Sequence, residues 1–298
     1  MMTAPSQPAL RGELRLDESL KRYNTWRVGG RARQMYLPAD RADLAMFLQT
    51  LPADEPLLWL GLGSNLLIRD GGFSGTVIVL QGRLNALSIE GESVHVEAGL
   101  ACAKVARECA RANLTGAAFL AGIPGTMGGA LAMNAGAFGG ETWPIVAAVT
   151  TIDRCGVIRD RRPSQYSVSY RHVERPAEEW FVACELALRP GDATAEQGAI
   201  RALLDRRAAT QPTGQASCGS TFRNPPGDFA ARLIEASGLK GHRIGGAEVS
   251  TKHANFIINT GDASARDIER LIAHVGTEVE RQQGVSLRTE VHMVGEPA

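Results

Sequence analysis

Three polar residues of this chain have side chains suited to acid–base or electrostatic chemistry. Ser220 stands in SCGSTFRNPPGD (217–228), and a hydroxyl in a turn can donate a proton to a basic atom. Arg171 follows Ser-Tyr, and its planar guanidinium can hold a carboxylate through two hydrogen bonds. Glu290 lies in a strand-like stretch, LRTEVHMVG (287–295), where a carboxylate is either solvated or buried for a purpose. The sequence around Ser220 is not the GxSxG of a hydrolase nucleophile, and residue type alone leaves a structural role open for all three.

Two glycine-rich segments are suited to holding a phosphate group. They are GLGSNLLIRDGGFSG (61–75) and GIPGTMGGALAMNAG (122–136). Glycine lets a backbone approach a pyrophosphate closely and aim successive N–H groups at it. Gly61 and Gly63 fit the first two places of the dinucleotide pattern GxGxxG, but Leu66 occupies the third, and the sequence has no GxxxxGK[ST] loop. The segments therefore predict nucleotide or flavin binding outside both common motifs, with structural turns as the alternative.

Hydrophobic periodicity predicts the elements that would position these residues. Predicted strands cover 57–63, 76–80, 93–99, 180–188 and 253–261. Predicted helices follow Asp40, cover 101–112 and 195–209, run from Asp228 to Gly238, and cover 264–284 with Ser264 and Asp267 as a capping pair. Residues 1–20 are predicted as a frayed lead-in, and 115–140 as too glycine-rich for an ordinary helix or strand. Since strands and helices mix without a fixed repeat, we expect an α+β fold.

Composition excludes several classes of protein. The 298 residues suggest two domains or three small ones, and Lys+Arg and Asp+Glu both number 32, so no global charge favours nucleic acid or an anionic membrane. The 5 cysteines lack a CxxC pair and fit neither a disulfide framework nor a metal site, and we expect Cys102 and Cys109 in a core. No apolar run predicts a signal sequence or membrane span. We therefore expect a soluble cytoplasmic protein that binds no nucleic acid, membrane, metal or obligate protein partner.

Six motifs, in order along the chain, resemble the UDP-N-acetylenolpyruvoylglucosamine reductase family. They are NTWRVGG (24–30), GLGSNLLIRDGGFSG (61–75), AGIPGTMGGALAMNAGAFG (121–139), SYR (169–171), GSTFRNP (219–225) and GAEVSTKHANFIIN (246–259). The resemblance spans about residues 20–295. It implies a flavoenzyme, UDP-N-acetylmuramate dehydrogenase, in peptidoglycan precursor synthesis. Its cofactor would be FAD, its hydride-donating cosubstrate NADPH, and its substrate UDP-N-acetylglucosamine enolpyruvate.

The resemblance also implies a fold and its division into domains. The expected α+β fold has a FAD-binding domain of the vanillyl-alcohol-oxidase type, with subdomains at 1–80 and 81–205, and a substrate-binding α+β domain at 206–298. The last strand is placed either in that domain or back in the FAD-binding domain. Because no insertion after Arg171 could supply the tyrosine-bearing loop of longer relatives, the chain resembles the shorter subclass with a more open site.

Position by position, the resemblance implies roles for individual residues. A hydride would pass from flavin N5 to the terminal enol carbon, Ser220 would protonate the adjacent carbon, Arg171 would stabilise charge on the substrate carboxylate, and Glu290 would assist. Asn224 and Arg223 would contact the substrate diphosphate. The expected FAD contacts are Gly61, Gly63, Ser64, Asn65, Leu66, Gly122, Ile123, Pro124, Gly125, Thr126, Gly128, Gly129, Asn134 and Gly136.

Two other functions stay open on the sequence. A flavin oxidase of the same broad fold would react directly with oxygen and often anchors its flavin covalently, but neither His95 nor any cysteine has an anchoring context. A non-catalytic protein that binds nucleotide sugars would be favoured by loss of Ser220, Arg171 or Glu290, and all three are present.

Overall fold

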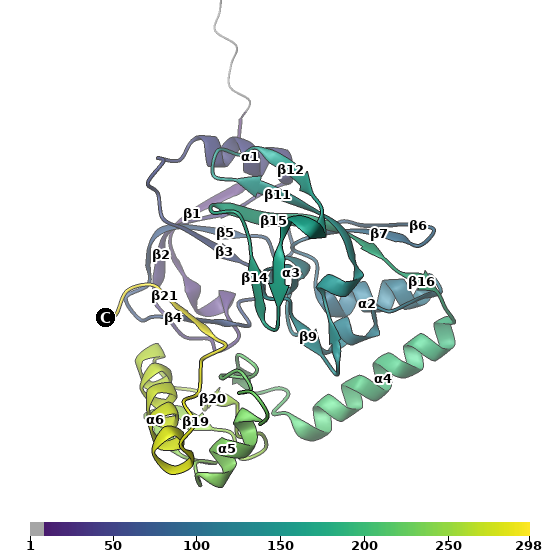
Figure 1. The fold of residues 1–298 in the computed structure, drawn as a ribbon. Coiled ribbons are helices and arrows are strands. Elements are labelled where there is room, and N and C mark those ends of the chain that lie inside the picture. The colour runs from purple at the N-terminus through teal and green to yellow at the C-terminus, as the bar shows by residue number, and fades with distance from the viewer. Residues whose placement is uncertain (1–8) are drawn as a thin grey trace, which may run out of the picture.

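A sheet of parallel strands with one antiparallel edge forms the N-terminal part of the molecule (Figure 1). The computed structural model describes residues 9–298. The strands run in the order β1 (Glu13–Ser19), β2 (Arg31–Leu37), β5 (Phe73–Val79) and β3 (Leu57–Leu60). Strands β2, β5 and β3 are parallel, and β1 pairs antiparallel with β2. The strands predicted at 57–63 and 76–80 are confirmed.

Helix α1 (Arg41–Gln49) packs against this sheet and begins as the sequence predicted. The carboxylate of Asp40 accepts a hydrogen bond from the N–H of Asp43 and caps the helix. The prediction of a frayed lead-in is wrong for Glu13–Ser19, which form β1, whereas residues 1–8 lie outside the described residues. Leu16 on this edge strand is 69% exposed. The segment therefore lacks the alternation of buried apolar and exposed polar residues that predicts a strand.

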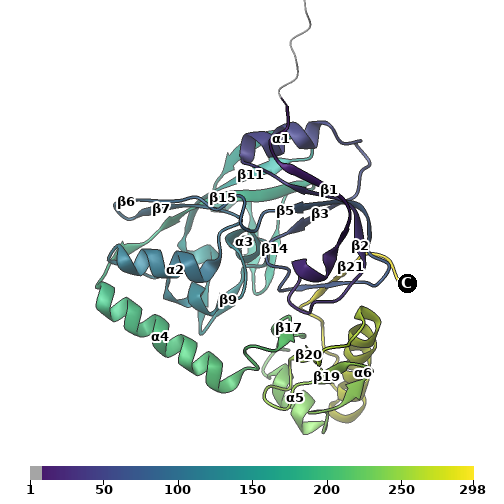
Figure 2. The ribbon, with the colours of Figure 1, turned by 180° about the vertical axis from the view of Figure 1, so that it is seen from behind.

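An antiparallel sheet of five strands forms the middle of the chain. Its order is β12 (Ile158–Arg161), β11 (Val146–Asp153), β15 (Glu179–Ala187), β7 (Ser93–Glu97) and β6 (Leu87–Glu90). The strands predicted at 93–99 and 180–188 are confirmed, as are the helices α2 (Cys102–Arg111) and α4 (Ala193–Thr210). Burial in the core raises the pKa of Cys102 and Cys109 to about 12, which keeps both thiols protonated. Figure 2 shows α4 running along the outside of this part toward the C-terminal part.

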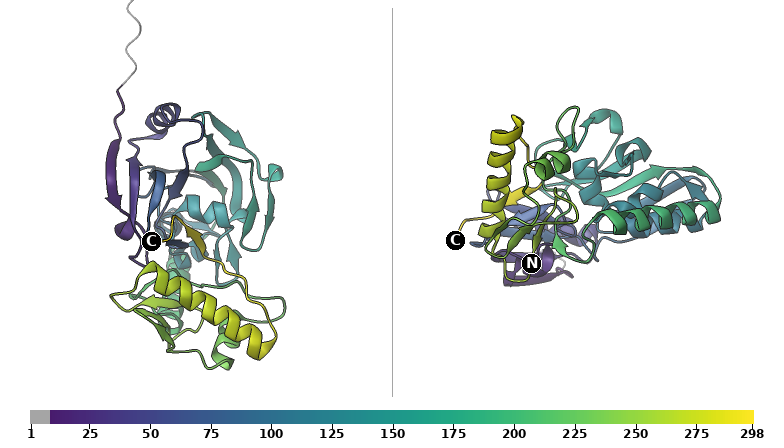
Figure 3. Two further views of the ribbon diagram at one scale, coloured as in Figure 1. Left: turned by 90° about the vertical axis from the view of Figure 1, so that its left-hand side faces the viewer. Right: turned by 90° about the horizontal axis from the view of Figure 1, so that it is seen from below.

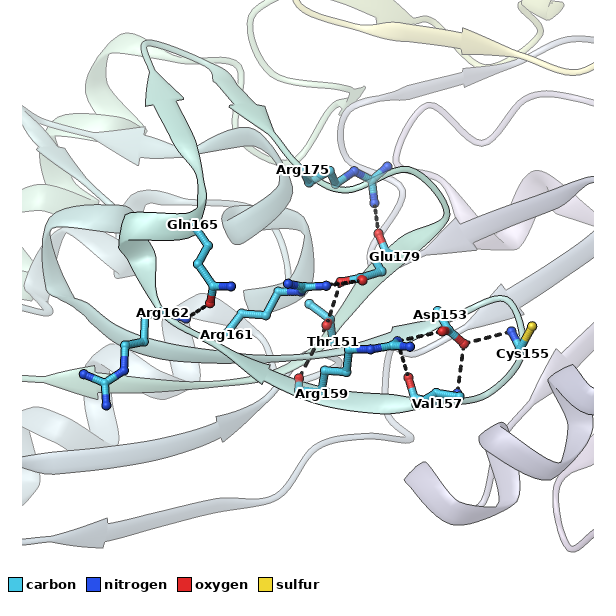
Figure 4. Close-up of polar contacts among 10 residues, drawn as sticks. All are labelled: Thr151, Asp153, Cys155, Val157, Arg159, Arg161, Arg162, Gln165, Arg175 and Glu179. Carbon is cyan, nitrogen blue, oxygen red and sulfur yellow. Dashed lines mark hydrogen bonds and ion pairs between the residues drawn. The ribbon is translucent and has the colours of Figure 1, made fainter.

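A polar network joins this sheet to a neighbouring hairpin (Figure 4). The side chain of Glu179 accepts a hydrogen bond from Arg161 Nε at 2.7 Å, and this bond holds the pKa of the Glu179 carboxyl below its ordinary value. The main-chain oxygen of Glu179 accepts a hydrogen bond from Arg175 Nη1 at 2.8 Å. Arg175 directly follows the hairpin of β13 (Ser167–Ser169) and β14 (His172–Glu174). The base of this hairpin is therefore fixed to the sheet.

The glycine-rich stretch 115–140 contains a helix where the sequence predicted none. Helix α3 (Met127–Met133) has two glycines in its first turn. A Cβ atom at Gly128 would lie 2.9 Å from the Cβ of Ala98, so the helix can approach the end of β7 this closely only with glycine there. Tertiary packing therefore outweighs the low helix propensity of glycine.

The C-terminal part, at the bottom of Figure 1, has its own sheet, and its core also includes Trp26, Val28 and Leu67 from the N-terminal part. Its strand order is β17 (Ala216–Ser217), β20 (Ile257–Asn259), β19 (Ala247–Val249) and β18 (Arg243–Ile244). Helix α6 (Ala265–Gln283) begins at the predicted capping box of Ser264 and Asp267. The strand predicted at 253–261 is shorter than expected, because only Ile257–Asn259 forms ladder pairs.

The start of helix α5 (Ala230–Ala236) differs from the prediction. Its N-cap is Phe229 rather than Asp228, whose carboxylate accepts a hydrogen bond from the N–H of Phe229 and pairs with Arg232. The prediction that Asp228 caps this helix is therefore wrong by one residue. Because Asp228 pairs with a residue in the first turn, its carboxylate still lies near the helix N-terminus.

The chain returns from the C-terminal part to the N-terminal part. Strand β21 (His292–Val294) pairs in parallel with β4 (Leu66–Ile68), and the left view of Figure 3 shows the C-terminal part beneath the two larger sheets. The domain boundaries at residues 80 and 205 stay predictions. Among residues 9–298, no helix is long and apolar enough to cross a bilayer. Short elements are β8 (Leu114–Thr115), β9 (Gly136–Ala137), β10 (Gly140–Glu141), β16 (Arg189–Pro190), and the 3-10 helices Leu20–Tyr23, Ala118–Gly122, Trp143–Ile145 and Pro163–Gln165.

Candidate active site

The two glycine-rich segments lie against each other. A Cβ atom at Gly61 would lie 2.3 Å from Thr126 Oγ1, and one at Gly125 would lie 3.6 Å from Ser64 Oγ. Gly61 follows β3 and Thr126 precedes α3, so a loop that leaves the N-terminal sheet meets the loop that leads into α3 at this point. The approach of Thr126 to position 61 leaves no room for a side chain there.

A cavity of about 530 Å³ opens beside these loops. Ser64 and Pro124 from the glycine-rich segments line it, together with residues of the C-terminal part and the end of α4. Its lining contains Arg22, Arg27 and Arg207 but no aspartate or glutamate. Since guanidinium groups bind phosphate oxygens well, the cavity suits a ligand that carries phosphate groups.

The glycine-rich loops beside this cavity fit FAD. At Gly129, the atom nearest to an added Cβ would be Thr126 Oγ1 at 3.9 Å, and at Gly125 the nearest would be Ser64 Oγ at 3.6 Å. Such uncrowded backbone can be approached closely by a flat ring or a pyrophosphate. Of the predicted FAD contacts, Ser64 and Pro124 line the cavity itself.

Other predicted FAD contacts take part in the packing of the loops themselves. Those that are buried or closely approached by neighbouring atoms are Gly61, Gly63, Gly122, Ile123, Thr126, Gly128 and Gly136. Leu66 begins β4, and Asn65 Nδ2 donates to the main-chain oxygen of Glu290 at 3.1 Å. The side-chain amide of Asn134 bonds to three protein groups. Main-chain N–H groups are therefore the chief candidates for FAD contacts from these segments.

Arg171 lies at the tip of the hairpin β13–β14. Tyr170 and Arg171 form its two-residue turn, and Arg171 has a φ of 54°, in the left-handed region. Its guanidinium donates to the main-chain oxygen of Gly136 at 2.8 Å and to that of Asn134 at 3.3 Å. Nε donates to Glu290 Oε1 at 3.1 Å. Three acceptors, two in the segment that follows α3 and one on Glu290, thus fix the plane of the guanidinium.

The carboxylate of Glu290 lies in a site that excludes most water. The side chains of Glu290 and Arg171 are each 17% exposed. Burial raises the pKa of the Glu290 carboxyl, while the positive charges of Arg171 and Arg223 act in the opposite direction. Arg223 Nε is buried, and it has no hydrogen-bond partner among the described residues. This donor is therefore available to a ligand only if the ligand displaces the atoms that cover it.

Ser220 lies in a loop that runs beside Glu290. The N–H of Glu290 donates to the main-chain oxygen of Thr221 at 2.8 Å, and Thr221 is the next residue after Ser220. Ser220 is half-buried, and Gly219 before it lines the cavity. The structure therefore brings Arg171 and Glu290 into contact and places the loop of Ser220 against the main chain of Glu290, with Gly219 of that loop lining the cavity.

The two predicted substrate contacts lie in the same loop. The N–H of Arg223 donates to the main-chain oxygen of Arg288 at 2.9 Å, next to the Glu290 segment. Asn224 is exposed, and its Oδ1 accepts a hydrogen bond from the N–H of Ala230 at 3.1 Å, at the start of α5. The amide nitrogen of Asn224 has no hydrogen-bond partner among residues 9–298, which leaves it free to donate.

Comparison with known proteins shows the family. The chain is 62% identical over 285 residues to the UDP-N-acetylenolpyruvoylglucosamine reductase of Alkalilimnicola ehrlichii, covering 96% of this chain and 96% of that one. It belongs to the UDP-N-acetylenolpyruvoylglucosamine reductase family. The reductase of Methylococcus capsulatus is 59% identical over 280 residues, covering 94% of this chain and 92% of that one. The crystal structure of the Thermus caldophilus reductase has a TM-score of 0.82 and 33% identity, covering 96% of this chain and 99% of that one.

Two family models match successive parts of the chain. A model described as a FAD binding domain matches residues 32–160, and one described as the C-terminal domain of UDP-N-acetylenolpyruvoylglucosamine reductase matches residues 211–294. The family resemblance, the α+β fold class and FAD as the cofactor are therefore confirmed. The roles of individual site residues stay predictions.

The sequence prediction missed several residues that line the cavity. Asn24, Thr25 and Arg27 come from NTWRVGG, a motif that supported the family resemblance but was assigned no contact. Arg22 precedes it, and Arg207 lies in the last turn of α4. The arginine-rich composition of this helix was visible, but no local pattern distinguishes a cavity arginine from a solvated one.

Proposed function

We propose that this protein catalyses the FAD-dependent reduction of UDP-N-acetylglucosamine enolpyruvate to UDP-N-acetylmuramate, in peptidoglycan precursor synthesis, with NADPH as the hydride donor. The observation that carries the proposal is the pair of Arg171 and Glu290 beside the Ser220 loop. A guanidinium paired with a buried carboxyl, next to a loop that carries a hydroxyl and borders the arginine-lined cavity, suits the reduction of an enolpyruvyl acid. We propose that this reaction takes place in the cytoplasm.

FAD would be held by the loops around Ser64 and Pro124, with Arg22, Arg27 and Arg207 available to its phosphate groups. Bound FAD would supply the hydride chemistry between NADPH and the terminal enol carbon of the substrate. The protein contributes the orientation of the substrate, the exclusion of water and the proton.

Arg171 would stabilise the negative charge that develops when a hydride adds to the enolpyruvyl group. That charge spreads into the substrate carboxylate, which gains electron density as the adjacent carbon becomes basic. A fixed donor in a site with little water lowers such a barrier, and loss of one typically costs about 3 kcal/mol. The three hydrogen bonds of Arg171 keep its guanidinium oriented before the reaction begins.

Ser220 would donate its hydroxyl proton to the carbon next to the substrate carboxylate. A serine is an ordinary weak acid, and it suffices because the receiving carbon is strongly basic. Glu290 would orient Arg171 and, in its protonated form, could donate a hydrogen bond. Arg223 and Asn224 would bind the diphosphate of the substrate, since both come from the same loop as Ser220.

The replacement Ser220→Ala tests this assignment. We expect the variant to bind FAD and to be reduced by NADPH at the wild-type rate. Reoxidation by UDP-N-acetylglucosamine enolpyruvate should slow by about 10²- to 10⁴-fold, the usual contribution of a positioned acid. The measurement is the visible flavin spectrum during stepwise addition of NADPH and then the UDP-sugar.

A matched control is Ser237→Ala, which removes a serine hydroxyl at the end of α5, where it donates to the main-chain oxygen of Leu233. This control should leave both half-reactions unchanged. Equal slowing of both half-reactions in the Ser220 variant would assign the serine to flavin binding. Rapid NADPH consumption by the wild type without the UDP-sugar would favour a flavin oxidase instead.

A further inference from the structure

Asn134 occupies a buried position at the end of helix α3. Its φ of 43° places it in the left-handed region, and it is 1% exposed. Asparagine tolerates this conformation better than most residues. Its Oδ1 accepts a hydrogen bond from the N–H of Trp143 at 3.1 Å, and its Nδ2 donates to Glu141 Oε2 at 2.9 Å and to the main-chain oxygen of Ser169 at 3.2 Å. All these partners are protein groups, so its amide is committed within the chain.

Two of the hydrogen bonds of Asn134 lead to Arg171. Ser169 is the last residue of β13, directly before the turn of Tyr170 and Arg171. The main-chain oxygen of Asn134 itself accepts from Arg171 Nη1 at 3.3 Å. Asn134 therefore holds both the strand that leads into the hairpin tip and the guanidinium at the tip.

We propose that Asn134 is a positioning residue for Arg171, with Glu141 as its support. The inference rests on the proposed function. Asn134 acts through two contacts, one on the hairpin and one on the guanidinium, and Glu141 fixes the orientation of its amide. This role differs from the FAD contact predicted from the sequence. It gives the buried amide a function in the step that involves the substrate, because Arg171 acts on the substrate carboxylate.

The variant Asn134→Asp keeps the size of the side chain but removes both donors. It also places a second carboxylate beside Glu141. We expect the hairpin tip to shift, and a displacement of about 1 Å at a catalytic group can slow a reaction by about 100-fold. Reoxidation of the reduced enzyme by UDP-N-acetylglucosamine enolpyruvate should therefore slow by about 10- to 100-fold, whereas reduction by NADPH should keep its wild-type rate.

A second readout does not depend on the substrate. The guanidinium of Arg171 lowers the pKa of the Glu290 carboxyl, so its displacement should raise that pKa further. NMR titration of Glu290 in the FAD-bound variant measures this shift. If the wild type fails to react with the UDP-sugar but the Glu290 shift is present, the proposed function fails and the positioning role survives.

Three further variants separate positioning from a loss of stability. Thr142→Val removes a buried hydroxyl bond to Ala135 in the same loop, at 2.7 Å, and should change neither readout. Glu141→Ala should show a smaller form of the Asn134→Asp effect, and it carries the test if Asn134→Asp does not fold. Adding Glu141→Gln to Asn134→Asp restores a hydrogen bond with donor and acceptor exchanged and should recover part of the rate.

The positioning role is overturned by either of two results. One is that the Asn134→Asp and Glu141→Ala variants fold, are reoxidised by the UDP-sugar at the wild-type rate and show an unchanged pKa of Glu290. The other is equal slowing of both half-reactions with weaker FAD binding, which would return Asn134 to the role predicted from the sequence.

Discussion

The variant Arg171→Lys separates charge from geometry at the candidate active site. The guanidinium donates to Gly136 at 2.8 Å, to Asn134 at 3.3 Å and to Glu290 at 3.1 Å. A lysine ammonium keeps the positive charge, but its single nitrogen cannot replace a planar fork that reaches three acceptors. If two hydrogen bonds are lost at about 1 kcal/mol each, the free energy of unfolding falls by about 2 kcal/mol. The loss of an oriented donor from the developing charge costs about 3 kcal/mol, which is about 100-fold in rate.

We therefore expect Arg171→Lys to fold, bind FAD and accept a hydride from NADPH normally, and to pass it to the UDP-sugar about 100-fold more slowly. Rapid-mixing measurements of flavin absorbance resolve the two half-reactions. Arg154→Lys is the matched control, because Arg154 also combines an ion pair with Glu178 and a hydrogen bond to the main-chain oxygen of Glu55. Wild-type reoxidation in the Arg171 variant would show that positive charge alone suffices and would refute the geometric argument.

Two other predictions concern the close approach of Gly61 to Thr126 and the buried carboxyl of Glu290. In Gly61→Ala the added methyl meets Thr126 Oγ1, and overpacking costs about 1–3 kcal/mol, so FAD affinity measured by flavin fluorescence should fall roughly 5- to 100-fold. Adding Thr126→Ala should restore part of it, and unchanged affinity in the single variant would contradict the close approach. Burial raises the pKa of Glu290 above its ordinary value of 4.5, so the folded chain binds this proton more tightly than the unfolded chain does. The contribution of this bound proton to the free energy of unfolding is complete below pH 4.5 and is lost as pH rises through the raised pKa. Because glutamine does not titrate, Glu290→Gln should gain stability relative to the wild type over this pH range. Urea unfolding at several pH values measures the difference, and a trend in the wild type's favour would contradict it.

Local sequence patterns were sufficient to predict an element where it buries one face and where capping residues identify its ends. Helix α6 combines a stripe of apolar residues with the capping pair of Ser264 and Asp267, and both features lie within one short stretch of sequence. The candidate site residues Ser220, Arg171 and Glu290 were predicted differently, through motifs shared with a family. Their own surroundings in the sequence carried no sign of a common site, because their contact depends on a hairpin tip meeting a loop from the other end of the chain.

The elements that the sequence did not predict depend on neighbours that are distant along the chain. Strand β1 is held by ladder bonds to β2 while Leu16 faces solvent, so nothing in its own residues required a strand. Helix α3 exists because Gly128 can lie against Ala98, and its glycines would disfavour the same segment as an isolated helix. In both cases, packing against a segment distant along the chain determines that the element forms.

The same reasoning explains why Asn134 was assigned to FAD. In the sequence it stands in a glycine-rich segment with the composition of a phosphate loop, and an amide there is equally suited to a ligand or to the protein. What separates these roles is the hairpin β13–β14, which brings Ser169 and Arg171 to the end of α3. Under the proposed positioning role, Asn134 lies in a ligand-binding motif because that motif also holds the group proposed to act on the substrate. The half-reaction affected by its replacement distinguishes the two roles.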